Sequence, residues 1–379
     1  MSIQTAIDKN KAAISENHIE NSKGKVGFKR PEWKRISLPE SVFPIPSGTV
    51  EATVNSQSEK ISVKPIEAGE DVTVKFDDLG HATLGAVFTD YIKAHHNSGS
   101  FIHATGKATE IPVVDMHYVL GADASTLVDS HLILAESGSE VDVVMDYYAD
   151  SGRQASHYGI TRILAKRGSR VRLYKLQRLD EQAHHFDQIF SVVEEGATVE
   201  VFDVQIGGCF KAISVHSILE GRHSESIAKS IYLGEKNAKL DLSFTMTHRG
   251  QKSKSEILSK GALESDSKKV FRGNLFFETG ASQSTGKEEE FVMLLGDTVQ
   301  SDSIPALMCS EDDVIGEHAA SVGQIDYNKL FYLMSRGFSE KEAKKLVIKA
   351  SFEEILSEVP FAGFKGTVSD EVDKRLALG

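Results

Sequence analysis

The sequence predicts a mainly β protein whose core is a coiled solenoid of strands, a β-helix. Between about residues 50 and 315, short runs rich in β-branched and aromatic residues are separated by Gly, Ser, Asp and Asn. Such runs are typical of strands and the turns between them. No long helical period interrupts them, and the Asn-Gly and Asp-Gly turns of tight hairpins are missing. These features favour a coil over an antiparallel meander.

A small or polar turn recurs before the strands at intervals close to 30 residues. Five strands are predicted to begin at Val141, Val171, Val199, Leu240 and Val270, and their starts are separated by 30, 28, 41 and 30 residues. A repeat of this size is typical of stacked units that bury their apolar faces against each other. A generic antiparallel sandwich is the alternative that this pattern leaves open.

Residues 1–49 are expected to form an N-terminal segment outside a core that covers residues 50–320. Residues 1–20 have the pattern of a short polar helix, and residues 21–50 hold four of the eight prolines. Proline fixes φ and removes a backbone donor, so this stretch predicts an extended strap. Trp33, the only tryptophan, is expected to pin the strap onto the core.

Residues 321–379 change to a helical period and predict a compact C-terminal module. Asp326 is expected to cap a first helix that stops at Gly337. Ser339 and Glu342 form a capping-box pattern at the start of a second helix, which Pro360 ends. Such a module either protects the last strand edge of the core or docks a partner.

The composition argues against several classes of function. The 379 residues include 55 acidic and 43 basic side chains, a net charge of −12 without a dense basic run. Nucleic acid and anionic membrane surfaces both require a basic face, so neither is an expected partner. No stretch approaches the roughly 20 apolar residues that span a bilayer. The polar N-terminus and the two cysteines favour a reducing, cytoplasmic location.

Motifs for nucleotide binding and hydrolysis fail in this sequence. Residues 280–287 resemble a phosphate loop, but five residues separate the two glycines. Glu288 stands where Ser or Thr would hold magnesium. No Gly-x-Ser-x-Gly elbow and no His-Glu-x-x-His helix is present. Asp142 and Asp146 are the candidate acids for a carbohydrate-active enzyme on a β-helix, but their spacing serves no special geometry in a strand.

The cysteines and the paired histidines predict no self-contained metal centre. Cys209 and Cys309 lie 100 residues apart, which excludes a cluster site with four cysteine ligands. We expect Cys209 to be a buried, inert thiol and Cys309 to be more exposed. Neighbouring strand residues point to opposite faces, so His95-His96 and His184-His185 are expected to be surface residues that do not chelate one metal.

Glu317 and His318 place a carboxylate beside an imidazole just before the predicted helices. Both groups ligate iron, and histidine titrates near neutral pH. The pair is therefore a candidate metal site. A histidine that is merely hydrogen-bonded at a strand end is the alternative.

The segment from Glu311 to Ala343 closely resembles the C-terminal signature of the SufB/SufD family of iron–sulfur cluster assembly scaffolds. It holds an acidic turn, His318 followed by small residues, and a helix pair that contains Leu-Phe-Tyr-Leu and Arg-Gly-Phe-Ser. Weaker similarities lie in Pro31-Glu-Trp-Lys34, Lys260-Gly261 and Ala281-Ser-Gln-Ser284. The resemblance implies a right-handed parallel β-helix with short helical segments at both ends.

The resemblance also implies a scaffold role without enzymatic activity of its own. Subunits of this family pair along the β-helix, and their C-terminal helices bind the SufC-type ABC ATPase. A transient iron–sulfur cluster is assembled with the partner subunits. His318 then becomes a ligand or proton carrier at that interface, with Glu317 as a possible carboxylate partner. The residues implied in ATPase docking are Leu330, Phe331, Tyr332, Arg336 and Gly337.

The resemblance is closer to SufD than to SufB at one position. SufB members carry a cysteine about 28 residues before this histidine, and the same count from His318 reaches Glu290. A carboxylate cannot accept persulfide sulfur. The partner is a second SufB/SufD-type subunit, in a heterodimer or a homodimer. A purely structural interaction module and a carbohydrate-active enzyme are the alternative functions.

Overall fold

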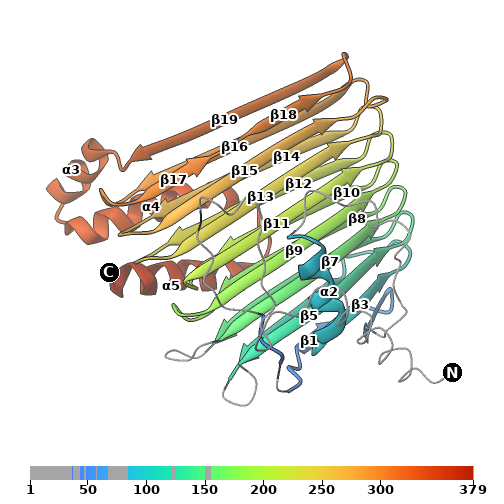
Figure 1. Cartoon of the computed structure of the whole chain (residues 1–379), viewed down its shortest axis with the longest axis horizontal. Helices are drawn as coiled ribbons and strands as arrows, with labels where there is room; N and C mark the ends of the chain where they lie inside the picture. The colour runs from blue at the N-terminus through green and yellow to red at the C-terminus, as the bar shows by residue number, and fades with distance from the viewer. Residues whose placement is uncertain are drawn as a thin grey trace.

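A computed structural model describes residue 36 and residues 43–46, 48–56, 58–66, 84–121, 125–149 and 155–378. These residues form a parallel β-solenoid of about eight turns (Figure 1), which confirms the predicted β-helix core. The expected N-terminal helix and Trp33 lie outside the described residues. None of the helices within these ranges is long and apolar enough to cross a membrane.

Two sheets run along the solenoid, and each coil adds one strand to each sheet. Among the described residues, the first sheet has nine strands, parallel except for the antiparallel pair β1–β4. In spatial order they are β1 (Thr53–Ser56), β4 (Val113–Leu120), β6 (Glu140–Ala149), β8 (Arg170–Arg178), β10 (Thr198–Gln205), β12 (Glu225–Gly234), β14 (Lys254–Leu263), β16 (Ser284–Leu294) and β19 (Val314–Gln324). From β4 to β16, neighbours in space are thus two strands apart along the chain and parallel, which excludes the antiparallel sandwich alternative.

The second sheet is built from the intervening strands and faces the first. Its described members are β2 (Ile61–Pro65), β3 (Ser98–Ala104), β5 (Thr126–Ala135), β7 (Ser156–Ala165), β9 (His184–Val193), β11 (Phe210–Leu219), β13 (Lys239–His248), β15 (Lys268–Phe277) and β17 (Gln300–Ser303), with β18 (Ala306–Cys309) also paired to β15. Only the β2–β3 pair of this sheet is antiparallel within the described chain. Each coil therefore holds two strands where the sequence repeat indicated one.

The spacing of 41 residues in the sequence repeat now has a physical explanation. The first three predicted strands lie in β6, β8 and β10 of one sheet, whereas the last two lie in β13 and β15 of the other. The turns that enter the first sheet need a residue with positive φ, and Gly138 and Gly196 supply it at 71° and 64°. Later turns place His223 and Lys252 at φ 58° and 57° instead, so the glycine signal disappears while the coil continues.

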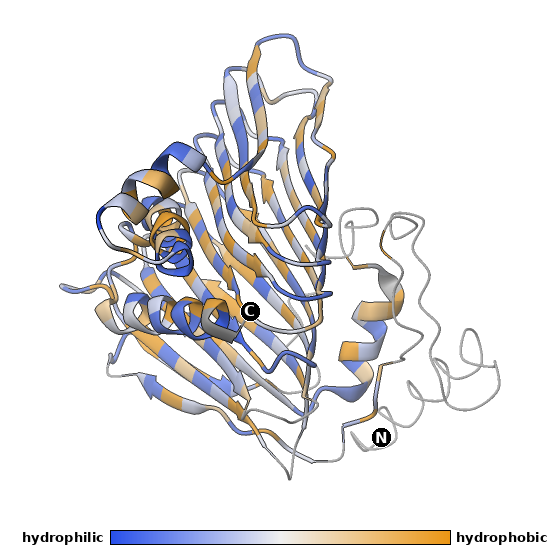
Figure 2. Cartoon of the chain, turned by 90° about the vertical axis from the view of Figure 1, so that its left-hand side faces the viewer, coloured by the Kyte–Doolittle hydropathy of each residue, from blue (hydrophilic) through white to orange (hydrophobic). Residues whose placement is uncertain are grey.

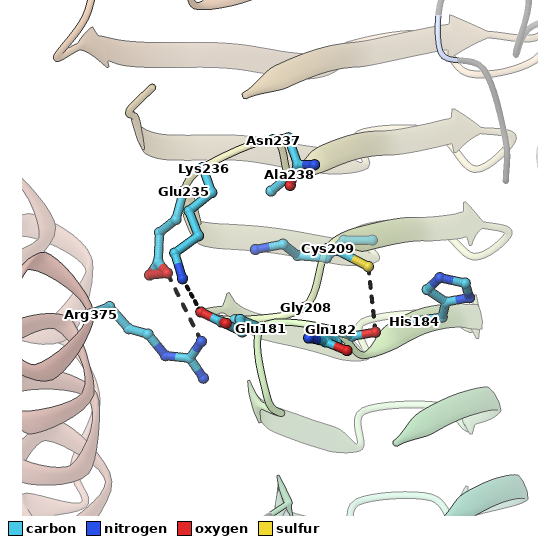
Figure 3. Close-up of a pocket in the computed structure, with 12 residues that line it drawn as sticks. Glu181, Gln182, His184, Gly208, Cys209, Glu235, Lys236, Asn237, Ala238 and Arg375 are labelled. Atoms are coloured by element: carbon cyan, nitrogen blue, oxygen red, sulfur yellow. Dashed lines mark hydrogen bonds and ion pairs between the residues drawn. The ribbon is translucent and has the colours of Figure 1, made fainter. Parts of the chain in front are cut away.

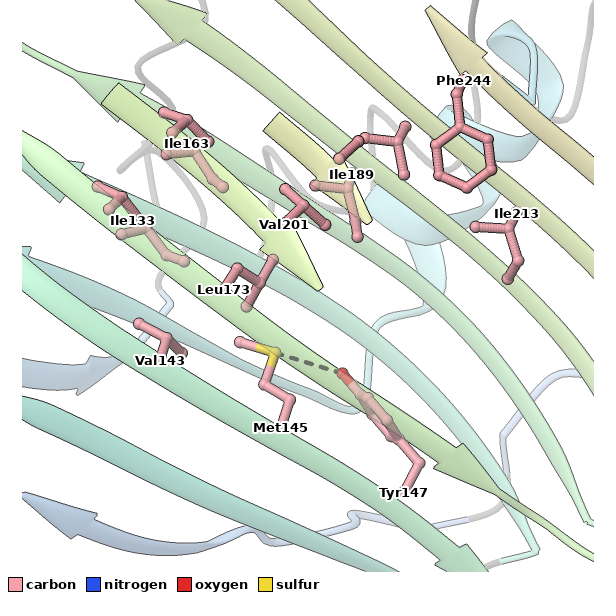
Figure 4. Close-up of a cluster of buried hydrophobic side chains, with 14 of the residues drawn as sticks. Ile133, Val143, Met145, Tyr147, Ile163, Leu173, Ile189, Val201, Ile213 and Phe244 are labelled. Carbon is pink, nitrogen blue, oxygen red and sulfur yellow. Dashed lines mark hydrogen bonds between the residues drawn. The ribbon is translucent and has the colours of Figure 1, made fainter. Parts of the chain in front are cut away.

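Aliphatic side chains from both sheets fill most of the solenoid interior. Parallel, in-register pairing stacks like positions, so Val143, Leu173 and Val201 form one column along the first sheet. All three are at most 1% exposed. Figure 4 shows them facing Ile133 and Ile163 of the second sheet. Because each coil covers the apolar face of the coil before it, the stack is stable only as a whole.

The C-terminal helices are α3 (Tyr327–Ser335), α4 (Glu340–Leu356) and α5 (Ala362–Leu378). The predicted caps are present: the Asp326 side chain accepts from two backbone N–H groups, and Ser339 and Glu342 form a capping box. The second helix ends before Pro360, as expected. The sequence patterns did not indicate α5.

Helices cover both outer faces of the solenoid. Ile348 and Phe352 of α4 and Val368 of α5 pack on the outer face of the first sheet, against residues such as Phe202. The second sheet is covered by α2 (Ala86–His95), whose Phe88 packs among aromatic side chains. Figure 2 shows the C-terminal helices on one side of the sheets and α2 on the other. Helix α2 is a ten-residue insertion in the β region that the sequence patterns did not indicate.

Some inward positions are polar, and Asp203 on β10 links the solenoid's stability to pH. The side chain is fully buried, and only Oδ1 receives a hydrogen bond, from Gln205 Nε2 at 2.8 Å. Burial, with Asp187 nearby, raises the pKa of Asp203 from 3.8 to about 7. Between these values the unfolded chain loses a proton that the folded chain keeps, so this carboxyl lowers stability as pH rises.

We expect Asp203→Asn to remove the fall in stability between pH 4 and 7 that is due to this carboxyl. At pH 8 the variant should be more stable by roughly 2–4 kcal/mol, because it no longer ionises a buried group. Urea unfolding at several pH values measures this, with the exposed Asp297→Asn as the control. An Asp203→Asn profile that runs parallel to that of the unmodified chain would contradict the interpretation.

Candidate functional site

The solenoid ends in β19, and this strand carries both predicted site residues. It is the last strand of the first sheet in the part of the chain that the structure describes, at the end opposite β1 (Figure 1). Gly316 and His318 pair in register with Gly286 and Glu288 of β16. These positions face inward, since a Cβ on Gly316 would touch Leu307 and Phe277. His318 nevertheless is exposed, because no further coil follows among the described residues.

Glu317 and His318 lie on opposite faces of the strand. Successive residues of a strand alternate between its two faces, so Glu317 points outward on the side of Lys287. The two side chains cannot bind one ion together in this arrangement. The carboxylates on the same face as His318 are instead Glu288 and Glu290 of the neighbouring strand.

Glu290 is the centre of a buried polar network directly below β19. Its carboxylate receives hydrogen bonds from Lys269 Nζ at 2.7 Å, Tyr232 Oη at 2.8 Å and Ser303 Oγ at 2.5 Å. Both Glu290 and Lys269 have fully buried side chains. Burial lowers the pKa of Lys269, although the Glu290 carboxylate opposes this shift. Glu290, where the resemblance to SufB implies a cysteine, is thus part of a buried ion pair in this chain.

Glu288 differs from its neighbour because its buried carboxylate has no partner. The side chain is 1% exposed, and neither oxygen receives a hydrogen bond. Burial, with Glu290 nearby, raises the pKa of Glu288 to about 7. Across the described residues, no three His, Cys, Asp or Glu side chains converge as a metal site would require. An ion bound by His318 therefore needs at least one ligand from outside the described residues of this chain.

The second predicted site is α3, which presents most of its apolar side chains to solvent. Leu330 is its one buried residue, whereas Phe331 and Tyr332 are 62% and 57% exposed. The Arg336 guanidinium lies 5.3 Å from the centre of the Tyr332 ring. Gly337 ends the helix with φ 99°, which returns the chain toward α4. Four of the five predicted docking residues are therefore exposed, and the fifth, Leu330, is buried and anchors the helix.

An apolar groove of about 590 Å³ separates α3 from α4. Tyr332 and Leu333 line one side, and Leu346, Val347 and Ala350 line the other. Exposed apolar surface of this kind on a folded chain typically marks a binding site for another protein.

A polar pocket of about 430 Å³ lies where α5 meets the turns of the solenoid (Figure 3). Cys209 lies partly buried in its wall, less buried than predicted, and burial raises the pKa of its thiol. Arg375 of α5 donates to the backbone oxygen of Leu179 at 2.6 Å and to Glu371 at 2.8 Å. The Arg375 guanidinium, the main cation of this pocket wall from α5, is thus already hydrogen-bonded within the chain. Cys309 is exposed, as expected.

Other candidate residues have structural partners. Asp142 and Asp146 each form a two-bond ion pair with an arginine, Arg172 and Arg178. Of residues 280–287, the first four form a turn and the last four already belong to strand β16, with no helix after the loop. Because both aspartates are bound to arginines, they do not form the free acid pair that a glycoside hydrolase needs.

The histidine pairs also differ from the prediction. His185 is 1% exposed and stacks inside the solenoid on His157, whose Nε2 lies 3.1 Å from Asp129 Oδ2. His184, beside it, is only partly exposed, and His95 ends helix α2 instead of lying in a strand. The strand alternation was predicted correctly. The sequence does not show which face of the strand points into the solenoid, so it could not show which histidine of the pair is buried.

The sequence model of the family described as "SUF system FeS cluster assembly, SufBD core domain" matches residues 118–351, more than half of the chain. The chain belongs to the SufB/SufD family. An iron–sulfur cluster assembly SufBD family protein of Mycobacterium leprae is 28% identical over 266 residues, which are 70% of this chain and 30% of that protein. Membership of this family supports a role of the chain in iron–sulfur cluster assembly.

Both named branches of the SufB/SufD family are among the relatives. Bacillus subtilis SufD is 23% identical over 295 residues, which are 74% of this chain and 64% of SufD. Bacillus subtilis SufB is 27% identical over 266 residues, which are 70% of this chain and 57% of SufB. The chain thus matches less than two thirds of the length of each relative. The closer similarity to SufD stays a prediction, since these identities do not separate the branches.

We expect Lys269→Met to destabilise the chain by about 3–5 kcal/mol, because it leaves the buried Glu290 carboxylate without its cation. Chemical denaturation measures the loss. The double variant Lys269→Met with Glu290→Gln should recover most of it, since no buried charge remains. Lys287→Met, which removes an exposed lysine of the adjacent strand, is the control. A Lys269→Met variant as stable as this control would contradict the role of the ion pair.

Proposed function

We propose that this chain is a scaffold subunit of the SUF complex that pairs with a SufB/SufD-type subunit and binds a SufC-type ATPase. Iron and sulfide are its cargo, and the chain is not an enzyme on its own. The observation that carries the proposal is the open end of the solenoid. There an edge strand whose outer side no described strand covers, an exposed histidine and an exposed aromatic helix follow each other within residues 314–337.

Pairing through β19 is supported by the length and exposure of that strand. It runs for 11 residues, and the described chain supplies no strand for its outer edge. Free edges of this length are normally covered or blocked, because their N–H and C=O groups pair readily with another strand. A second SufB/SufD-type subunit with the same edge would meet these groups and enclose His318. Both a heterodimer and a homodimer fit this arrangement.

Docking of the ATPase on α3 and α4 is supported by the apolar groove and by the firm attachment of α4. Lys229 and Lys260 of the first sheet form ion pairs with Glu358 and Glu354, at 2.5 Å and 2.6 Å. These contacts frame the apolar layer between α4 and the sheet. A movement imposed on the groove would therefore reach the sheet that ends in β19.

The cargo chemistry assigns unequal tasks to the two scaffold subunits. His318 supplies an imidazole for an iron ion or proton at the interface. Glu290 cannot carry sulfur, so we assign the sulfur carrier that SufB-type subunits have at this position to the partner subunit. This division favours a SufD-like role in the cytoplasm, where thiols remain reduced.

We expect Phe331→Ala combined with Tyr332→Ala to weaken binding of the SufC-type ATPase by about 10- to 100-fold. Truncation of an aromatic anchor in an interface typically costs about 1–3 kcal/mol. The chain is expressed with the SUF ATPase and scaffold subunits of its own organism, and binding is measured by co-purification and titration. Val119→Ala, at an apolar position of β4 that is 59% exposed, is the control.

Three outcomes would count against this assignment. Recovery of the unmodified chain without any partner would contradict the scaffold role. Undiminished ATPase binding by the double variant would place the docking surface elsewhere. Turnover of a uronate polymer by the purified chain would favour the carbohydrate-active enzyme instead.

A further inference from the structure

The least satisfied group at the open end is the Glu288 carboxylate. Buried polar atoms in folded proteins nearly always have a hydrogen-bond partner, and an exception calls for an explanation. Both Glu288 oxygens are buried without one. The nearest cation of the network, Lys269, is already bound to Glu290 and Ser303. Glu288 therefore keeps two acceptor oxygens that no described group of this chain uses.

The chain makes room for this carboxylate inside the solenoid. A Cβ on Gly273 of β15 would lie 2.5 Å from Glu288 Cδ, so the glycine leaves the space in which this carboxylate lies. The strand could have placed this acid outward, as it does with Glu289, whose carboxylate pairs with Lys287 Nζ at 2.8 Å. The packing thus leaves space for the inward Glu288 side chain but provides no hydrogen-bond donor for its carboxylate.

The register places Glu288 directly beside His318. The two residues are paired on β16 and β19, and adjacent strands lie about 4.8 Å apart. Both side chains point to the same face of the sheet, His318 at the open end and Glu288 one strand deeper. Carboxylate and imidazole at this separation are a ligand pair that ferrous iron and similar divalent ions accept.

We propose that Glu288 and His318 together bind a divalent transition-metal ion at the open end of the solenoid, ferrous iron being the physiological cargo. The carboxylate paired with His318 is then Glu288 and not Glu317, which lies on the other face. Two ligands do not complete a coordination shell, so the remaining ligands come from the subunit that pairs with β19. This inference rests on the proposed function and names the cargo-binding residues within it.

Titration with Co²⁺ alone tests the proposal, because bound Co²⁺ reports its ligands by visible absorption without cluster assembly. The full chain is titrated both alone and in its complex. We expect Glu288→Gln and His318→Ala each to weaken Co²⁺ binding at least tenfold, and the double variant to be no weaker than the single ones. Glu317→Gln and Glu289→Gln, which change acids on the outward face, should alter it less than twofold.

Folding and function are controlled separately. Glu288→Gln removes an unpaired buried charge, so its melting temperature should not fall, and lost binding cannot be assigned to unfolding. Equal Co²⁺ affinity of Glu288→Gln and the unmodified chain, or no Co²⁺ binding even in the complex, would overturn the inference. If the complex still forms in that case, the scaffold role stands. If no complex forms, the proposed function itself fails.

Discussion

In-register parallel stacking is the constraint on which the rest of this structure depends. Each coil leaves an inward apolar face and two strand edges that only the next coil can satisfy. Along most of the solenoid this requirement is met, as the columns of Val143, Leu173 and Val201 show. At β19 the solenoid ends, because the described chain supplies no further coil. The last coil therefore exposes what every earlier coil hides, and this surface lies beside α3.

The same stacking explains how much could be predicted from the sequence. Local signals were sufficient for the caps at Asp326 and Ser339, because cap chemistry depends on neighbouring residues. They favoured the β-helix but left a sandwich open, and the parallel coil was implied by the resemblance to the family. They failed where the cause is not local. The glycine turns that mark β6 and β10 are replaced by His223 and Lys252 before later strands of the same sheet. Helix α5 has no clear apolar period to reveal it.

The candidate site shows the same division. The C-terminal signature pointed to His318 and to the aromatic residues of α3, and the structure places both at the open end. Adjacency in sequence suggested Glu317 as the partner of His318, but the two residues lie on opposite faces of the strand. In a parallel sheet the relevant neighbour is 30 residues away, on β16. Only the register reveals that Glu288 shares the face of His318 and lacks a hydrogen bond.

Amide hydrogen exchange along β19 tests the central claim most directly. In the isolated chain the outer amides of residues 314–324 have no strand partner in the described structure and should exchange rapidly. We predict that binding of a SufB/SufD-type subunit slows them strongly, while the amides of β8 and β10, inside the sheet, stay protected throughout. Unchanged exchange along β19 in the assembled complex would contradict the account.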